Sequence, residues 1–462
     1  MHDVATTPDQ YDFQDEGVDW LADGALTKYL ADEMGMGKSV QEIRAADRLG
    51  VDHIDVICPA IAVEDWARKF HTWSDYGRTI IRSFKARPFP QALAPRKSVI
   101  INGFESAVAN RALYKANRGG ILMVDEAQYL MNPATMRAKA LYGGDCCGFG
   151  GISQNYDAVW VSSGTPTPNG DPRELWAHLH ALRPYSIIDP ATGLPMSYNA
   201  FGDRFCFFKP GLGGLRCIGT RNEPDLLKIL GGPRRFMLRR LGNVAGLPDV
   251  RFEIYPMVPH TVPRELDPAR WPDLTDRLDA IIDAAGEGDM DTQLEEEMAT
   301  LRRLTGLLKV EATVALLTDE LRRGQLDKVV VFGYHVDVVN EIAKRLNLAG
   351  FRGGAITGAT SSAKRWELID GFNADRDRFI AGQILATATN TSLGGCRHVL
   401  FAETDWVGDN NVQAAFRCRR IDSHRDPILA RILSITGTLD ERIQAAARRK
   451  MRQSRLILPT SQ

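Results

Sequence analysis

The 462-residue sequence lacks the features that mark several large classes of protein. None of its seven cysteines forms a Cys-x-x-Cys pair, and the adjacent Cys146-Cys147 suits neither a zinc site nor an easy disulfide. No apolar run approaches the roughly 18 uncharged residues that span a bilayer. The N-terminus, Met1-His2-Asp3-Val4, has neither the basic nor the apolar region of a secretion signal. We therefore expect a cytoplasmic protein with reduced thiols and no membrane partner.

An excess of charge of one sign is also missing. The sequence has 57 lysines and arginines against 58 aspartates and glutamates, which gives no global field to attract nucleic acid or a membrane. Any site for a polyanion must therefore be a local groove. The chain is too long for one ordinary core, so we expect two or three domains. We expect the protein to be a monomer.

What the sequence does contain is a repeated apolar run followed by a helical segment, which predicts α/β units around parallel sheets. In the first half the expected strands are Lys28–Ala31, Ile54–Cys58, Ser98–Asn102, Gly120–Val124 and Ala158–Ser162. In the second half they are Lys328–Gly333, Gly354–Thr357, Phe379–Leu385, His398–Ala402 and Arg431–Ile435. Each strand of the first half ends in polar or glycine-containing sequence, where open α/β sheets bind ligands.

Between the two halves the pattern changes. Residues 172–247 mix helical segments with glycine and proline breaks, and the stretch from Pro248 to Pro272 is rich in proline and charge. We expect a first lobe over 1–250 with a helical insertion at about 172–247. A linker and helical segment would follow over 251–305, and a second lobe over 306–462.

The segment after the first expected strand is suited to holding phosphate. Gly35 and Gly37 allow backbone turns in which successive N–H groups point the same way, and Met36 lies between them. Lys38 would contact the β- and γ-phosphates of ATP, and the Ser39 hydroxyl would ligate Mg²⁺. Two observations leave another interpretation open. The general pattern has glycine where this chain has Asp32, and a glycine turn with a solvated lysine would look similar.

Paired carboxylates end another expected strand, at Asp125 and Glu126. An acid at a buried strand end can hold Mg²⁺ through its water shell, and a second can orient or deprotonate the attacking water. We assign Asp125 to the metal and Glu126 to the water. The alternative is a strand that ends in a solvated acidic turn.

Two further stretches supply polar groups. Ser163 and Thr165 are small hydroxyls in a turn at a strand end, suited to relaying hydrogen bonds from a nucleotide site, although ordinary turns have the same composition. On an expected helix, Gln413, Arg417 and Arg420 are spaced by four and three residues, so they share one face. Guanidinium groups on one face can stabilise a transferring phosphoryl group, but a solvated basic helix would look alike.

In this order, the motifs resemble those of the superfamily 2 nucleic-acid motors, specifically the Swi/Snf-type branch. The phosphate loop of that branch also carries Asp at the position of Asp32. Leu301-Arg302-Arg303-Leu304-Thr305-Gly306 is similar to the annealing-helicase subgroup in particular. The other matching stretches are Phe13 to Leu21, Cys58-Pro59-Ala60 with Trp66, Asp125-Glu126-Ala127-Gln128, Ser163 to Asn169, Phe236 to Arg240 with Leu247-Pro248, Phe332 to His335, Thr357-Gly358 with Arg365, and Gln413 to Arg420.

The resemblance implies roles for further residues. Gln14 would contact adenine, Gln413 would bind ATP from the second lobe, and Gln128, Ser163 and Thr165 would be coupling residues. Pro59, Thr391 and Ser392 would contact DNA. The sequence departs from the family at four places: Ser39 stands for Thr, Gln128 for His, Asn390 for Gly, and Ile421-Asp422-Ser423 for the Gly-Gln ending.

The fold implied is two tandem RecA-like parallel-sheet lobes with ATP between them. Arg417 and Arg420 would reach the nucleotide from the second lobe. The activity implied is DNA-stimulated ATP hydrolysis that drives translocation on duplex DNA and remodelling of branched DNA, through sequence-independent phosphate contacts. A helicase that separates strands remains an alternative. So does a remodeller of a protein–nucleic acid complex such as RNA polymerase on DNA, with residues 172–247 as its partner surface. So compact a motor suits a prokaryotic cell or a phage-infected host.

Overall fold

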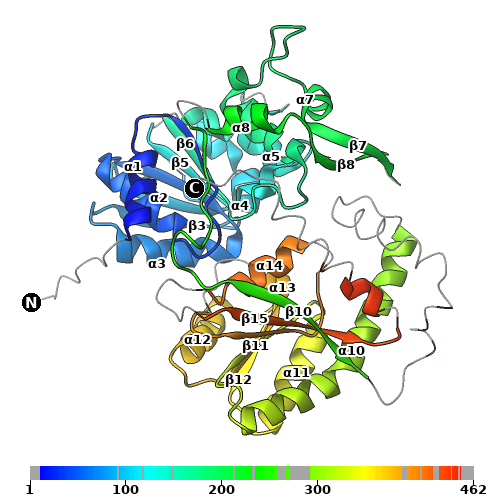
Figure 1. Ribbon diagram of the computed structural model, residues 1–462. Helices are drawn as coiled ribbons and strands as arrows, with labels where there is room; N and C mark the ends of the chain where they lie inside the picture. Colours follow the sequence, from blue (N-terminus) through cyan, green and yellow to red (C-terminus); the bar gives the residue numbers. More distant parts are fainter. Residues whose placement is uncertain are drawn as a thin grey trace, which may run out of the picture. The chain divides into compact units, whose positions relative to one another are not determined.

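The computed structural model forms two compact units, one mainly from residues up to 209 with residues 217–245, and one from residues 246–456 with residues 210–216. We call them the first and second lobes (Figure 1). The residues described are 11–90, 93–115, 119–144, 146, 150–211, 214–231, 235–258, 264, 267, 269, 292–387, 393–405, 408–419, 426–438, 440–445 and 448.

The first lobe is built on a seven-stranded sheet in which every neighbouring pair of strands is parallel. The strand order is β3-β4-β2-β5-β6-β1-β9. The five strands expected here are present at nearly the expected bounds. The strands are β1 (Thr27–Leu30), β2 (His53–Cys58), β3 (Thr79–Ser83), β4 (Ser98–Gly103), β5 (Ile121–Asp125), β6 (Ala158–Ser162) and β9 (Met237–Leu238).

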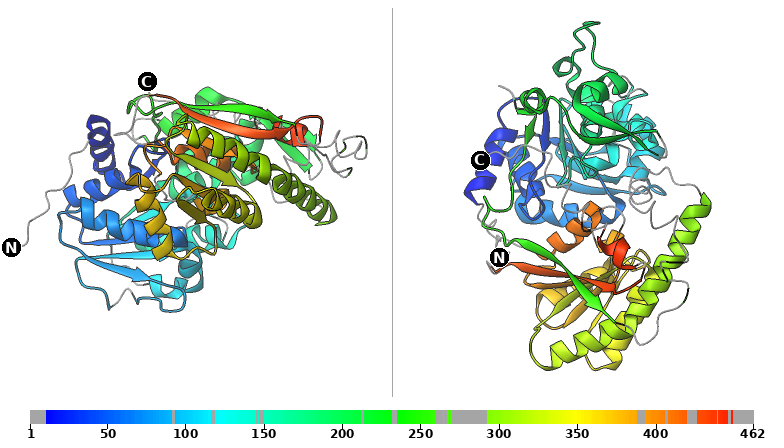
Figure 2. Two further views of the ribbon diagram at one scale, coloured as in Figure 1. Left: turned by 90° about the horizontal axis from the view of Figure 1, so that it is seen from below. Right: turned by 45° about the vertical axis from the view of Figure 1, so that its right-hand side comes forward.

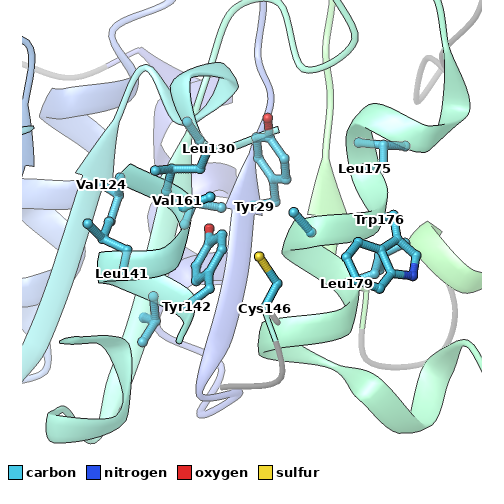
Figure 3. Packing of buried hydrophobic residues seen from close by; sticks show 14 of the residues in the cluster. Tyr29, Val124, Leu130, Leu141, Tyr142, Cys146, Val161, Leu175, Trp176 and Leu179 are labelled. Carbon is cyan, nitrogen blue, oxygen red and sulfur yellow. The ribbon is translucent and has the colours of Figure 1, made fainter. Parts of the chain in front are cut away.

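Both faces of this sheet are apolar, which explains why its strands are nearly continuous hydrophobic runs. Along β5, Ile121 and Met123 belong to one core cluster, and Leu122 and Val124 belong to the other. Figure 3 shows the cluster that contains Leu122 and Val124, in which Val124 and Val161 of the sheet pack with side chains of the covering helices. Alternate strand residues point to opposite faces, so each face needs its own layer of helices.

Two sets of helices supply these layers. The cluster that contains Ile121 and Met123 receives residues from α1 (Asp12–Leu21), α2 (Lys38–Arg48) and α3 (Val63–Trp73). The other cluster receives residues from α4 (Phe104–Ala109), α5 (Met136–Tyr142), α6 (Trp176–Leu182), α7 (Tyr198–Phe205) and α8 (Glu223–Gly231). Short 3₁₀ turns connect these elements at Ala60–Ala62, Arg111–Lys115, Ala127–Leu130, Ile152–Asn155, Pro172–Leu175 and Pro184–Ser186.

The insertion after residue 172 is not purely helical, which corrects the expectation from the sequence. Besides α6, α7 and α8 it contains a two-stranded sheet of β7 (Cys206–Gly211) and β8 (Gly214–Thr220). It also returns to the main sheet as β9, where the Tyr29 and Ala31 amides donate to the carbonyls of Phe236 and Leu238. A two-residue strand has no sequence periodicity, so only this long-range pairing defines it.

The second lobe is built on a six-stranded sheet with the order β10-β15-β14-β11-β13-β12, again with parallel neighbours. Its five expected strands are present. The strands are β10 (Val250–Met257), β11 (Val329–Gly333), β12 (Gly353–Ile356), β13 (Phe379–Gln383), β14 (His398–Phe401) and β15 (Ile428–Ile435). The helices are α10 (Thr292–Arg322), α11 (Val336–Leu348), α12 (Ser362–Asn373), α13 (Ile384–Thr387) and α14 (Gly408–Phe416). Among the described residues, no helix is long and apolar enough to cross a membrane.

The expected linker from residue 251 is wrong at its start, because these residues form β10. This strand pairs with β15 along its whole length, and Figure 2 shows the two side by side. Its side chains are mostly exposed, as an edge strand allows, and Pro256 is tolerated for the same reason. The composition of an exposed edge strand is close to that of a linker, which explains the error.

Candidate active site

Four segments of functional interest reach the same edge of the first lobe's sheet. The phosphate loop follows β1, Pro59 follows β2, Asp125 ends β5, and Ser163 follows β6. Asp125 and Leu30 both align in register with Ser162, the last residue of β6. Because the carboxyl ends of parallel strands share one edge, the topology brings residues far apart in sequence into one site.

The phosphate loop has the backbone that its glycines predict. Gly35 and Gly37 have φ values of 89° and 72°, in the left-handed region. A Cβ on Gly37 would lie 2.4 Å from Nε2 of Gln14, so a side chain there would displace the Gln14 amide. Helix α2 begins at Lys38, and its N-cap, Gly37, has no side chain to bond the N–H groups of the first turn. These N–H groups and the helix dipole favour an anion at this end.

Lys38 lies over the loop that precedes it. Its Nζ donates to the carbonyl oxygen of Asp32 at 2.8 Å and approaches that of Glu33 at 3.5 Å. The lysine is half-buried at the first position of α2. Its ammonium group is therefore held at the loop, and its contact with the phosphates of ATP stays a prediction.

Asp32, the departure from the general pattern, ties the loop to the end of the first lobe's sequence. Its side chain is fully buried and forms a 2.5 Å ion pair with Arg240, which is itself 3% exposed. The Arg240 backbone N–H also donates to Asp32 Oδ1 at 3.0 Å, and Gln41 donates to Oδ2 at 3.2 Å. The same Gln41 amide donates to the Met36 carbonyl at 3.2 Å. Asp32 is thus a structural anchor that holds the loop between α2 and the segment after β9.

Gln14, the expected adenine contact, lies against the phosphate loop. It is buried in the first turn of α1, where its Oε1 accepts from the Tyr11 N–H at 3.3 Å. Its Nε2 donates to the carbonyl of Met36 at 3.3 Å. The structure therefore places Gln14 against the phosphate loop, and its contact with adenine stays a prediction.

The two acids lie at the end of β5 in different environments. Asp125 is half-buried; its Oδ2 accepts from the Trp66 indole N–H at 2.8 Å, and its Oδ1 accepts from the Glu126 N–H at 3.0 Å. Glu126 is 8% exposed and has a φ of 54°, which is unusual for a residue with a Cβ. Backbone strain of this kind is found where a side chain must be aimed, which suits a group that orients water.

A chain of hydrogen bonds joins Glu126 to the Ser163–Thr165 turn. The Gln128 amide nitrogen donates to Glu126 Oε2 at 2.8 Å, and Ser163 Oγ donates to Gln128 Oε1 at 2.6 Å. The Thr165 N–H in turn donates to Ser163 Oγ at 3.0 Å. Gly164 lies against the phosphate loop, since a Cβ there would be 2.5 Å from Cγ of Met34. The three expected coupling residues are therefore connected to each other and to the acid.

Gln128 makes this connection independent of pH, which the family's usual histidine would not. A neutral imidazole can donate to Glu126 with one nitrogen and accept from Ser163 with the other, but an imidazolium cannot accept. We therefore expect Gln128→His to retain activity at pH 8 and to lose it as the pH falls through about 6.5, the ordinary pKa of histidine. The ratio of the ATPase rate of Gln128→His to that of the wild type, measured between pH 5.5 and 8.5, isolates this effect. A constant ratio would contradict the role assigned to Gln128.

Sequence reasoning missed one buried acid beside the site. Glu42 lies one turn after Lys38 in α2, and Ser162 Oγ donates to it at 3.3 Å. Burial, and next the charge of Asp125, raise the pKa of Glu42 well above its usual value. Burial at this position therefore disfavours the charged form of the carboxyl. Its spacing from Lys38 was the only signal in the sequence.

The second lobe contributes part of the arginine motif to the described residues. Gln413 is buried in α14, and Arg417 follows one turn later, just beyond the helix end at Phe416. The Arg417 N–H still bonds the Gln413 carbonyl at 3.2 Å, so the expected one-turn spacing holds although the helix is shorter than expected. Arg420, Thr391 and Ser392 lie outside the described residues.

The residues present fit ATP and Mg²⁺. A glycine-capped helix start with Lys38 suits phosphate oxygens, and the oxygen donors Ser39 and Asp125 suit a hard cation such as Mg²⁺. One other metal-like group occurs among the described residues, at Asp171, Cys206 and Cys217. The Arg173 guanidinium already pairs with this Asp171 carboxylate at 2.5 Å, and three ligands are one short of a structural zinc site.

Two family models match the chain. The SNF2-related domain matches residues 13–242, and the helicase conserved C-terminal domain matches residues 309–422. Fold and site together define an ATPase with two parallel-sheet lobes of the RecA-like kind. The chain belongs to the SNF2-related branch of the helicase-like ATPases, as the resemblance of its motifs implies.

Its relatives include proteins of the SMARCAL1 type and an annealing helicase. It is 25% identical over 441 residues to the SWI/SNF-related subfamily A-like protein 1 homolog of Caenorhabditis elegans, covering 93% of this chain and 59% of that one. It is 23% identical to human "DNA annealing helicase and endonuclease ZRANB3", covering 95% of this chain and 39% of that one. The chain thus spans about 40–60% of these relatives.

A solved structure titled "Sulfolobus solfataricus SWI2/SNF2 ATPase core in complex with dsDNA" is 18% identical. It covers 95% of this chain and 90% of that one, with a TM-score of 0.42.

Proposed function

We propose that the protein is an ATP-driven translocase on duplex DNA that remodels branched DNA. The observation that carries this proposal is the hydrogen-bonded connection Glu126–Gln128–Ser163, next to the phosphate loop. A phosphate-binding protein that only held its nucleotide would not require the acid to be linked to a second motif. A motor requires it, because hydrolysis must be tied to movement.

In this proposal the residues of the first lobe have separate tasks. Lys38 and the first turn of α2 bind the phosphates, and Asp125 with Ser39 orients Mg²⁺. Glu126 Oε2 accepts a proton from the attacking water. For this, the hydrogen bond that the Gln128 amide donates to Oε2 must first break. Mg²⁺ held by Asp125 and Ser39 would neutralise charge on the phosphoryl group. By resemblance to the family, Arg417 and Arg420 are assigned to the transferring phosphoryl group and Gln413 to ATP.

DNA contacts are assigned to Pro59, Thr391 and Ser392 by resemblance to the family. Pro59 lies at the carboxyl end of β2, on the edge that carries the nucleotide site. Because the contacts would be to phosphates, binding should weaken steeply with salt and depend little on base sequence.

The test is ATP hydrolysis measured without DNA and with single-stranded, duplex, forked and four-way DNA of equal nucleotide content. We expect stimulation of at least about tenfold by duplex or branched DNA. Arg417→Ala, Arg420→Ala and Lys38→Ala should each remove it while the circular dichroism spectrum is kept. Equal hydrolysis with and without DNA would rule out a motor on DNA.

Labelled forks separate translocation with annealing from strand separation. A duplex translocase should regress a fork or anneal its arms and should release little single strand. Release of single strand as the main product would instead identify a strand-separating helicase.

A second candidate is an ATP-driven remodeller of a protein–nucleic acid complex. The exposed Phe207 and Ile218 of the β7 and β8 pair favour it, because they give the insertion an apolar surface suited to a protein partner. Displacement of stalled RNA polymerase from a DNA template tests it. Displacement that Phe207→Ser abolishes, without changing DNA-stimulated hydrolysis, would support this candidate.

A further inference from the structure

Trp66 connects α3 to the carboxylate assigned to the metal. Its side chain is fully buried, and its indole N–H donates to Asp125 Oδ2 at 2.8 Å. The two residues are 59 positions apart in sequence, and α3 begins shortly after Pro59. Helix α3 therefore begins directly after the short turn that follows Pro59, the expected DNA contact, and donates a hydrogen bond to the acid assigned to the metal.

A tryptophan can be buried in this core without a hydrogen bond to its indole N–H. Trp160 packs in the same core cluster and is equally buried, yet its indole nitrogen has no hydrogen-bond partner among the described residues. A buried indole N–H without a partner costs free energy, so Trp66 satisfies a group that Trp160 leaves unsatisfied. Trp66 and Trp160 therefore allow a comparison of a buried tryptophan with and without a hydrogen bond to its indole N–H.

Two donors from different parts of the fold hold the Asp125 carboxylate. The Glu126 N–H bonds Oδ1 from the strand end, and the Trp66 indole bonds Oδ2 from α3. With both oxygens bonded, rotation of the carboxylate about its side-chain bonds is restricted. A metal ligand that is already oriented binds its cation with a smaller entropic cost.

We propose that Trp66 is the positioning residue for the Mg²⁺-binding carboxylate and makes the metal site respond to movement of α3. The proposal rests on the proposed function, in which Asp125 holds Mg²⁺. A shift of the Pro59–Val63 segment on contact with DNA would be passed through α3 to the indole and so to Asp125. DNA binding would then change the affinity for Mg²⁺ as well as the hydrolysis rate.

The first test measures ADP binding by calorimetry with and without Mg²⁺, in the wild type, Trp66→Phe and Trp160→Phe. Both variants lose an indole from the same core, and only the first loses a hydrogen bond to Asp125. For Trp66→Phe we expect the gain in ADP affinity produced by Mg²⁺ to fall about tenfold, the scale of one hydrogen bond to a charged group. Affinity without Mg²⁺ should stay within about twofold, and Trp160→Phe should keep the full gain. An unchanged gain in Trp66→Phe would overturn the proposal.

The second test needs no variant of Trp66 to fold. In wild-type protein with ¹⁵N-labelled tryptophan, the indole signal of Trp66 should shift when Mg²⁺ is added to the ADP complex, while that of Trp160 should not. An unmoved Trp66 signal would again overturn the proposal. Neither experiment uses DNA or hydrolysis. Loss of DNA-stimulated ATPase in the wild type would therefore count against the motor and leave the role of Trp66 to be decided by these measurements.

Discussion

Lys38→Ala is expected to lower ATP hydrolysis by at least about 100-fold, with or without DNA, while the protein stays folded. The Lys38 ammonium is held 2.8 Å from the Asp32 carbonyl at the N-terminus of α2, so its loss removes a fixed positive charge from the phosphate loop. The side chain is half-buried and forms no part of either core cluster, so stability should change little.

Steady-state phosphate release measures this effect, with circular dichroism as the check on folding. Lys344→Ala is the matched control, because Lys344 is 68% exposed and pairs with Glu341 on the surface of α11. It should hydrolyse ATP at the wild-type rate. Retained hydrolysis in Lys38→Ala would mean that the loop from Asp32 to Ser39 does not bind the reacting phosphates.

Asp32→Ala should have the largest effect on stability, a loss of about 3–5 kcal/mol. The substitution leaves the Arg240 guanidinium buried without the carboxylate that accepts from its backbone and side chain. Breaking a buried pair by removing one partner is costly because the other charge remains in a poorly solvating environment. Urea unfolding followed by tryptophan fluorescence should show the first lobe melting earlier.

Two further variants keep this prediction specific. Asp19→Ala removes an aspartate from an exposed ion pair with Arg48 and should cost less than about 1 kcal/mol. The double variant Asp32→Ala with Arg240→Met removes both buried charges and should recover part of the lost stability. Equal effects of Asp32→Ala and Asp19→Ala would show that the Asp32–Arg240 pair does not anchor the loop.

The order of apolar runs predicted most of the fold. Ten strands were expected and all ten are present, because strands buried on both faces are nearly continuous hydrophobic segments. β3, β9 and β10 were missed for a common reason. Short or exposed strands at the edges of a sheet carry little periodicity, and their pairing with β4, β1 and β15 comes from distant sequence.

The candidate site divides in the same way. Phosphate chemistry requires glycine, lysine and a hydroxyl within a few positions, so Gly35 to Ser39 could be found in the sequence alone. The acids Asp125 and Glu126 follow from their place at a strand end. The partners of Asp32, Asp125 and Gln128 could not be found in this way, since Arg240, Trp66 and Ser163 are distant in sequence.

The sequence by itself determined that the protein has two α/β lobes, that the first binds a nucleotide, and that its motifs follow the order of a DNA motor. These properties depend on local composition and on spacing along the chain. Only the tertiary structure decided what holds the motifs in place: Arg240 under Asp32, Trp66 beside Asp125, and Gln128 between Glu126 and Ser163. Hydrogen bonds between buried polar groups depend on which strand ends meet at one edge of the sheet, and no spacing within a single motif encodes that.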